Sequence, residues 1–120
     1  MGLDWYVITS DLTHFTEHYR GKWAAEILET YGYDTEVDDC FGKEEDDGRE
    51  YLTDIQRHNI ITALEKIRDD CEEDPETMEA KGKSLGYGDD LDYFCEDITE
   101  IIQFLQQVDT GEGVKIHCCY

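Results

Sequence analysis

The sequence is poor in basic residues, with 10 Lys and Arg against 31 Asp and Glu and a formal net charge of -21. A surface of one sign repels nucleic acid and anionic lipid, so neither is expected as a direct partner. The same field attracts basic surfaces and keeps a chain soluble, although self-repulsion lowers its stability. The charge balance therefore indicates a basic partner protein. A salt-adapted acidic surface with no dedicated partner is the alternative.

Long apolar runs are also missing, because no window approaches the ~18 apolar residues that a transmembrane helix needs. Residues 1–9 contain no basic region of the kind that begins a secretory signal, so we expect an intracellular protein. The five cysteines are odd in number and have no Cys-x-x-Cys spacing; they are Cys40, Cys71, Cys95, Cys118 and Cys119. In a reducing compartment they are predicted to be free thiols, with Cys71 and Cys95 in the core.

The clearest pattern that is present lies in residues 89–108. Apolar residues recur there at intervals of three and four, which predicts one buried stripe of a long amphipathic helix. The stripe consists of Leu91, Phe94, Cys95, Ile98, Ile101, Ile102, Leu105 and Val108. Asp92, Glu96 and Glu100 are four apart and therefore stack in a row along the opposite face. This helix thus combines a core-forming side with a row of carboxylates.

The first third of the chain is predicted to contain a strand, a helix and a second strand. Residues 3–9 are aromatic and β-branched, which indicates a central strand buried on both faces. A helix is then expected from Ser10 or Asp11 to Gly32. Its stripe consists of Phe15, Tyr19, Trp23, Ile27, Leu28 and Tyr31. Residues 33–37 alternate apolar and polar, which predicts a strand, and the acidic residues 38–51 predict a solvated loop.

The rest of the chain is predicted to be helical up to a closing strand. Thr53 and Gln56 form a capping box that begins a helix ending in the acidic residues 69–74, where carboxylates oppose the helix dipole. Pro75 starts a short helix, and residues 114–120 alternate as a strand. We predict one domain, residues 1–120, of the α+β class. It has two layers, a small three-stranded sheet covered on one face by about three helices, in the order β-α-β-α-α-β.

Four fragments carry a resemblance. They are residues 1–6 (Met-Gly-Leu-Asp-Trp-Tyr), residues 19–22 (Tyr-Arg-Gly-Lys), residues 39–42 (Asp-Cys-Phe-Gly) and the Cys-Tyr ending. In these fragments the chain resembles small uncharacterised proteins encoded by bacteriophages and large DNA viruses. The resemblance implies a viral accessory protein in the cytoplasm of its host cell. It brings no activity, cofactor or catalytic residue to transfer.

His14, Glu17 and His18 form the sequence His-x-x-Glu-His. On a helix, two histidines one turn apart can hold zinc while the glutamate activates water, as in inverted zincins. A small metal-dependent hydrolase or metal-binding protein using these residues, with Glu96 as a third ligand, is therefore the competing function. Three polar residues on the wet side of an amphipathic helix are the simpler interpretation. We accordingly predict no enzyme activity, no metal and no cofactor.

Two further patterns point to other chemistry. Residues 34–45 partly copy a calcium loop, but Asp39 stands where the loop needs glycine, and the alternation through Val37 favours a strand. His117 precedes Cys118 and Cys119, and a thiol beside a histidine can be activated as a nucleophile. No residue can be nominated to orient that histidine or to bind an oxyanion. A strand that alternates buried and exposed thiols is the simpler interpretation.

Carboxylates concentrate in residues 34–50, 69–79 and 89–100. Side chains four apart on a helix lie ~6 Å apart along its axis, close to two phosphate steps of ~3.4 Å, so such a surface can imitate a nucleic-acid backbone. The viral resemblance favours a non-enzymatic protein that occupies the Lys and Arg groove of a host nucleic-acid-binding or defence protein. The predicted partner-binding residues are Asp38, Asp39, Glu44, Glu45, Asp46, Asp47, Asp69, Asp70, Glu72, Glu73, Asp92, Glu96 and Glu100.

Overall fold

Five helices and five strands form two layers in the computed structural model, which describes residues 3–8, 15–19, 21–46, 48–86, 91–106 and 115–119. The strands are β1 (Asp4–Ile8), β2 (Phe15–Tyr19), β3 (Glu44–Asp46), β4 (Arg49–Tyr51) and β5 (Lys115–Cys119). The helices are α1 (Gly21–Thr30), α2 (Asp34–Asp39), α3 (Asp54–Glu73), α4 (Pro75–Ser84) and α5 (Leu91–Gln106). The predicted α+β class is confirmed.

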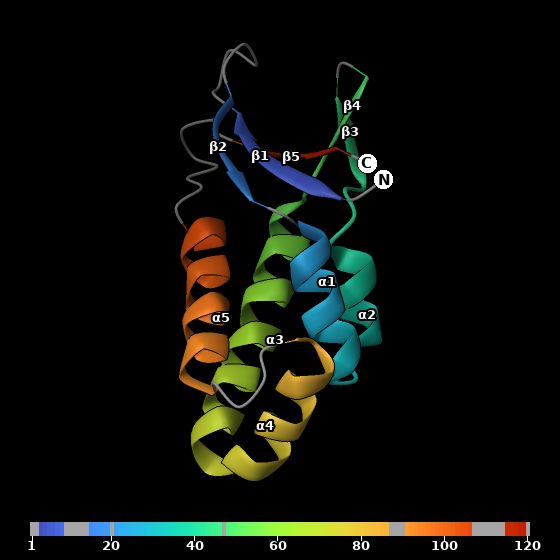
Figure 1. The fold of residues 1–120 in the computed structure, drawn as a ribbon. Helices are drawn as coiled ribbons and strands as arrows, with labels where there is room; N and C mark the ends of the chain where they lie inside the picture. The colour runs from blue at the N-terminus through green and yellow to red at the C-terminus, as the bar shows by residue number, and fades with distance from the viewer. Residues whose placement is uncertain are drawn as a thin grey trace.

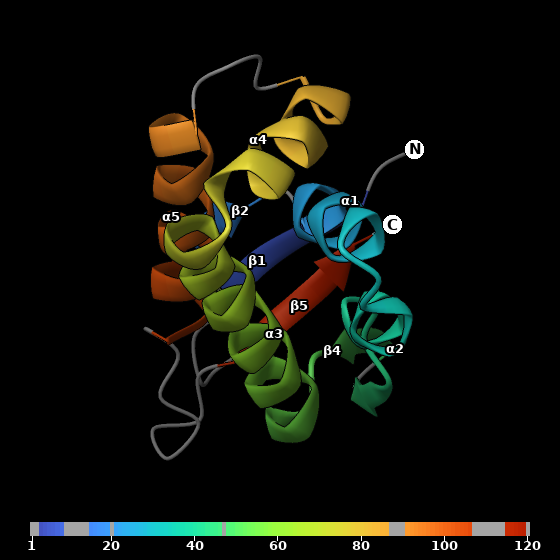
Figure 2. The ribbon, with the colours of Figure 1, turned by 90° about the horizontal axis from the view of Figure 1, so that it is seen from below.

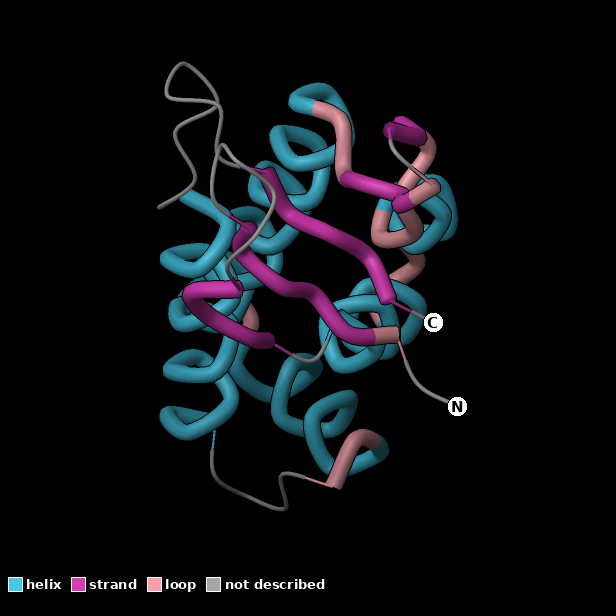
Figure 3. Tube along the Cα trace, turned by 90° about the horizontal axis from the view of Figure 1, so that it is seen from above, coloured by secondary structure: helices cyan, strands magenta, loops and turns pink. Residues whose placement is uncertain are grey.

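The sheet lies across one end of the group of helices, and the helices stand on the same side of it (Figure 1). Figure 3, in which the molecule of Figure 1 is seen from above, shows the strands in front and the helices behind. The prediction of helices on one face of a small sheet is therefore confirmed. No helix in the described part of the chain combines the length and the apolar character that crossing a membrane requires.

The sheet is antiparallel, with the strand order β2-β1-β5-β4-β3. Its central pair, β1 and β5, brings together distant parts of the sequence. Trp5 lies opposite Cys118 and Val7 opposite Ile116, and all four side chains are buried. Because successive strand residues point to opposite faces, these four define the face that meets the helices. The three strands of five residues form the main part of the sheet, and the β3–β4 hairpin extends one edge.

The core lies between this face and α1, α3 and α5. Trp5 is completely buried in it, stacked on Phe104 of α5 with 6.3 Å between ring centroids. Its Nε1 donates a hydrogen bond to the carbonyl oxygen of Cys40 at 3.0 Å. Gly21 begins α1 against the same indole, and a Cβ at that position would lie 2.5 Å from Trp5 Nε1. Only glycine therefore fits at the start of α1.

The strongly patterned elements match their predictions. The helix predicted over residues 89–108 is α5, and it buries five residues of the predicted stripe: Phe94, Ile98, Ile101, Ile102 and Leu105. Leu91 and Cys95 are only half-buried, and Val108 lies outside the described residues. The capping box before α3 is present: Gln56 N–H donates to Thr53 Oγ1 at 3.1 Å, and Thr53 N–H donates to Gln56 Oε1 at 2.8 Å. Helix α4 begins at Pro75 as predicted, and β1 and β5 are the predicted first and closing strands.

The helix predicted from Ser10 or Asp11 is wrong in its first half. Residues 10 and 11 lie outside the described residues, and Phe15–Tyr19 form β2, which pairs with β1. Aromatic and β-branched residues make up most of this segment, and they suit a strand. The second half is confirmed, because α1 buries Ile27 and Leu28.

The strand predicted over residues 33–37 is also wrong, because Asp34–Asp39 form helix α2. Tyr33 and Val37 are four apart, which fits one face of a strand and one turn of a helix equally well. Thr35 separates the two possibilities. In a strand it would share the buried face with Tyr33 and Val37, whereas in α2 it is exposed.

The loop predicted over residues 38–51 contains two short strands, which the high charge of the segment did not indicate. Glu44–Asp46 and Arg49–Tyr51 pair as the β3–β4 hairpin, and β4 continues the sheet beside β5. Gly48 has a φ of 75°, the left-handed conformation that tight hairpin turns require. The chain therefore has a second hairpin where the sequence predicted only a solvated loop.

Candidate functional site

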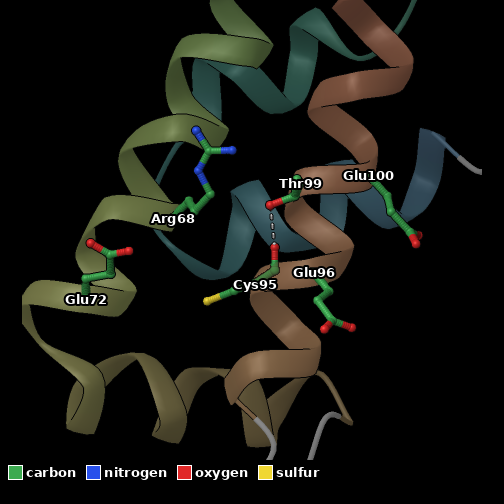
Figure 4. Close-up of a pocket in the computed structure, with 6 residues that line it drawn as sticks. All are labelled: Arg68, Glu72, Cys95, Glu96, Thr99 and Glu100. Atoms are coloured by element: carbon green, nitrogen blue, oxygen red, sulfur yellow. Dashed lines mark hydrogen bonds between the residues drawn. The ribbon is translucent and has the colours of Figure 1, made fainter.

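A groove of about 440 Å³ runs between α3 and α5. Arg68 and Glu72 of α3 line it together with Cys95, Glu96, Thr99 and Glu100 of α5 (Figure 4). The groove follows from how the two helices pack. Their apolar stripes meet in the core, so the residues beside each stripe face one another at the surface. Thr99 Oγ1 donates to the backbone oxygen of Cys95 at 2.9 Å, which satisfies the hydroxyl within the helix.

The rim of the groove is acidic and its floor is weakly polar. Glu72 stands on the α3 side, and Glu96 and Glu100 stand on the α5 side with their carboxylates directed outward (Figure 4). All three are exposed, and Arg68 is the one cation among the lining residues. The Cys95 thiol lies between the helices. This combination suits a cationic side chain with an apolar stem.

Two of the three predicted acidic segments meet at this groove. Glu72 comes from residues 69–79, and Glu96 and Glu100 come from residues 89–100. Asp69 and Asp92 are exposed on α3 and α5, outside the lining. Asp70 and Glu73 line a separate hollow of about 250 Å³ with Tyr31. The ammonium group of Lys81 already occupies that hollow, because Lys81 Nζ lies 4.9 Å from the centre of the Tyr31 ring.

The first acidic segment lies elsewhere. Figure 2 shows α2 and α5 on opposite sides of α3, so Asp38 of α2 does not share a surface with the groove. Asp39 was predicted to bind a partner, but it is only 8% exposed and accepts a hydrogen bond from Asn59 Nδ2 at 3.2 Å. Glu45 is exposed on β3. Glu44 and Asp46 are described only by their strand positions, and Asp47 lies outside the described residues.

The unbalanced surface charge predicts that salt will stabilise the protein. Exposed carboxylates repel one another most in the compact folded state, and salt screens them beyond ~10 Å at 0.1 M. Raising the salt from about 0.05 to 0.5 M should add about 1 kcal/mol to the free energy of unfolding, or about 4 °C in Tm. Thermal melts in NaCl and in KCl measure this, and the two salts should act alike because screening depends on ionic strength. A Tm indifferent to salt would contradict the prediction.

The helix that the alternative zinc site would need does not form at Glu17 and His18. Glu17 and His18 lie on strand β2, and His14 lies outside the described residues. Within the described ranges, no group of three or more His, Cys, Asp or Glu side chains is placed to hold a metal.

The calcium-loop pattern is likewise contradicted by the backbone, and of the two thiols in the thiol-enzyme pattern the structure excludes Cys118. Residues 34–45 divide between α2 and β3 and do not form one ligand loop. His117 and Cys118 are neighbours on β5 and face opposite sides, and His117 Nδ1 lies 3.0 Å from the carbonyl oxygen of Glu50. Cys118 is 2% exposed, and burial raises its pKa to about 12. It therefore stays a protonated, inaccessible thiol at neutral pH.

Nothing in the sequence indicates that Arg68 and Cys95 share a groove with the carboxylates. The helical periods place Arg68 beside the α3 stripe and Cys95 on the α5 stripe, but they do not say which faces of two helices oppose each other. No protein-family model, curated protein sequence or solved structure matches this chain. The geometry of the groove is therefore the basis for a function, and the viral resemblance stays a prediction.

Proposed function

We propose that this protein binds a basic partner protein by charge complementarity, and that the groove between α3 and α5 anchors the partner. One observation supports this most directly: acidic residues from two separate segments flank a single groove, Glu72 on one side and Glu96 and Glu100 on the other. The proposed function is non-enzymatic. A viral protein that inhibits a host nucleic-acid-binding or defence protein is the setting that the sequence resemblance implies.

The groove favours arginine-bearing partners over isolated cations. A guanidinium presents several N–H donors in a planar fork that matches carboxylates, and its hydrocarbon stem can pack on apolar surface. Here the stem would lie over Cys95 and Thr99 while the fork reaches the carboxylates of α5. Glu96 and Glu100 are one helical turn apart, ~6 Å along the axis, a spacing near that of alternate phosphates on a nucleic-acid strand.

Neutralising Glu96 and Glu100 together as glutamine should weaken binding of a synthetic amphipathic peptide that contains arginine and leucine. Exposed ion pairs contribute about 0.2–1 kcal/mol each, so the expected loss of affinity for the two together is about 2- to 30-fold. Isothermal titration calorimetry measures it at low and at high salt, because attraction between exposed charges falls as salt rises. Arg68→Gln removes the cation of the groove and should strengthen binding in the same assay.

The matched control is Asp38→Asn with Glu45→Gln, which makes the same change in net charge away from the groove. This pair should leave the affinity within about twofold of the unmodified protein. Equal losses in both double variants would show that only total charge matters, as expected for a salt-adapted surface without a binding site. Binding that does not weaken with salt would contradict charge complementarity itself.

A further inference from the structure

Two thiols meet beneath the groove. Cys71 of α3 is buried, with 4% of its surface exposed, and its side chain contacts that of Cys95 on α5, which helps to raise the Cys71 pKa. Cys95 is half-buried and lines the groove, and Figure 4 shows its sulfur directed from α5 toward α3. The two sulfurs are thus side by side although they belong to different helices.

We infer that Cys71 and Cys95 form an oxidisable dithiol, a modification site at which hydrogen peroxide produces an intramolecular disulfide joining α3 to α5. A disulfide needs its sulfurs within bonding reach after only small side-chain rotations, and two thiols in contact between packed helices are placed for that. This inference does not depend on the proposed partner binding.

The surroundings of the pair favour a small neutral oxidant. Solvent reaches Cys95 through the groove, whereas Cys71 is covered, so Cys95 is the sulfur that an oxidant meets first. Glu72, Glu96 and Glu100 surround this entrance. Their charge repels anionic oxidants such as oxidised glutathione, but it does not repel hydrogen peroxide.

The reaction balances in two steps. The Cys95 thiolate attacks one peroxide oxygen, the O–O bond breaks, and the second oxygen leaves as hydroxide, which gives a sulfenic acid at Cys95. Cys71 then loses its proton and attacks the Cys95 sulfur, so that the S–S bond forms and the sulfenic oxygen leaves as water. In total two thiols are oxidised by two electrons and one peroxide is reduced to two waters. Burial raises the pKa of Cys71 to about 12, so the second step is slow at neutral pH.

The remaining described cysteines differ in ways that make them useful controls. Cys40 and Cys118 lie near each other, with Cys118 Sγ 3.9 Å from the carbonyl oxygen of Cys40, but both are enclosed at 0% and 2% exposure. Cys40 Sγ also donates to the carbonyl oxygen of Glu36 at 3.4 Å. Peroxide should not reach this pair in the folded protein. Cys119 is exposed and could link two copies of the chain.

The test uses Cys119→Ser protein, treated with hydrogen peroxide, quenched with catalase, then unfolded and alkylated. We expect intact mass to show two fewer alkylated thiols and peptide mapping to show Cys71 linked to Cys95. Dithiothreitol should reverse both changes. The oxidised protein should also melt about 5 °C or more above the reduced protein, because the cross-link restricts the unfolded chain. Adding Cys95→Ser should abolish the link and the shift.

Two outcomes would overturn the inference. One is Cys95 oxidised to sulfinic acid without a link in the Cys119→Ser protein, and the other is a link that involves Cys40 or Cys118. Cys71→Ala should leave Cys95 without a resolving thiol and direct it to sulfinic acid. If that variant fails to fold, the peptide map of the Cys119→Ser protein decides alone. The disulfide should still form when Glu96 and Glu100 are glutamine, so failure of partner binding and failure of oxidation can be told apart.

Discussion

Replacing Trp5 by alanine is expected to destabilise the protein by about 3–5 kcal/mol. The side chain is completely buried where β1 meets α1 and α5, so its removal leaves a large cavity. The change also removes the stacking with Phe104 and leaves the carbonyl oxygen of Cys40 without the indole donor. A domain of this size is typically stable by about 5–15 kcal/mol, so the loss would be a large fraction of the total.

Urea unfolding followed by far-UV circular dichroism measures this difference. The control is the other tryptophan of the chain, Trp23, which is half-buried on α1. Trp23→Ala should cost clearly less than Trp5→Ala, because less surface returns to water and a partly open site leaves a smaller cavity. Equal losses for the two variants would contradict the central position assigned to Trp5.

Replacing Gln56 by glutamate should destabilise the protein by about 2–3 kcal/mol at pH 7. Gln56 is 3% exposed and joins two segments: its Oε1 accepts from Thr53 N–H, and its Nε2 donates to the carbonyl oxygen of Phe41 at 2.8 Å. A carboxylate can replace the acceptor. It cannot replace the donor, so a buried negative charge would face the Phe41 carbonyl oxygen.

The loss should depend on pH in a defined direction. Burial beside a carbonyl oxygen raises the pKa of the new carboxyl in the folded state above the ~4.3 of the unfolded chain. Below the unfolded value both states are protonated and the carboxyl can donate to Phe41, so the penalty is absent there. It grows as pH rises above that value, and at pH 5 it should be about half of that at pH 7 or less. Gln103→Glu, at an exposed position of α5, is the control and should show no such pH-dependent loss. A penalty independent of pH would contradict the assigned hydrogen bond.

The parts of the fold that could be predicted from sequence are those where several signals agree. In α3 the Thr53 and Gln56 capping box precedes a stripe of the right period, and α4 starts with Pro75 directly after it. In α5 the stripe is long enough that a strand period cannot imitate it. The signals did not agree at Tyr33 and Val37, because two apolar residues four apart satisfy both periods. Only the exposure of Thr35 in the folded protein separates helix from strand there.

The other errors have different causes. Phe15 and Tyr19 continued the spacing of the helix that follows them, so one stripe appeared to run through two elements. In the acidic segment, the Asp47-Gly48 pair was a hairpin signal that the surrounding charge masked. For the groove, sequence alone supplied Glu72, Glu96 and Glu100 as exposed acids. It could not predict that the three acids lie at one groove, because this depends on how α3 and α5 are rotated about their own axes.

The position of β5 determines when the sheet can form. β1 pairs with β2 and β3 with β4 through nearby residues, but these hairpins join only through β5, whose partner β1 lies almost a whole chain length away. Such distant pairing has a large entropy of loop closure and slows folding. Until β5 inserts, one edge of β1 stays unpaired and can recruit strands from other chains. The charge of -21 then has a second effect, because repulsion between incompletely folded copies opposes their aggregation during this delay.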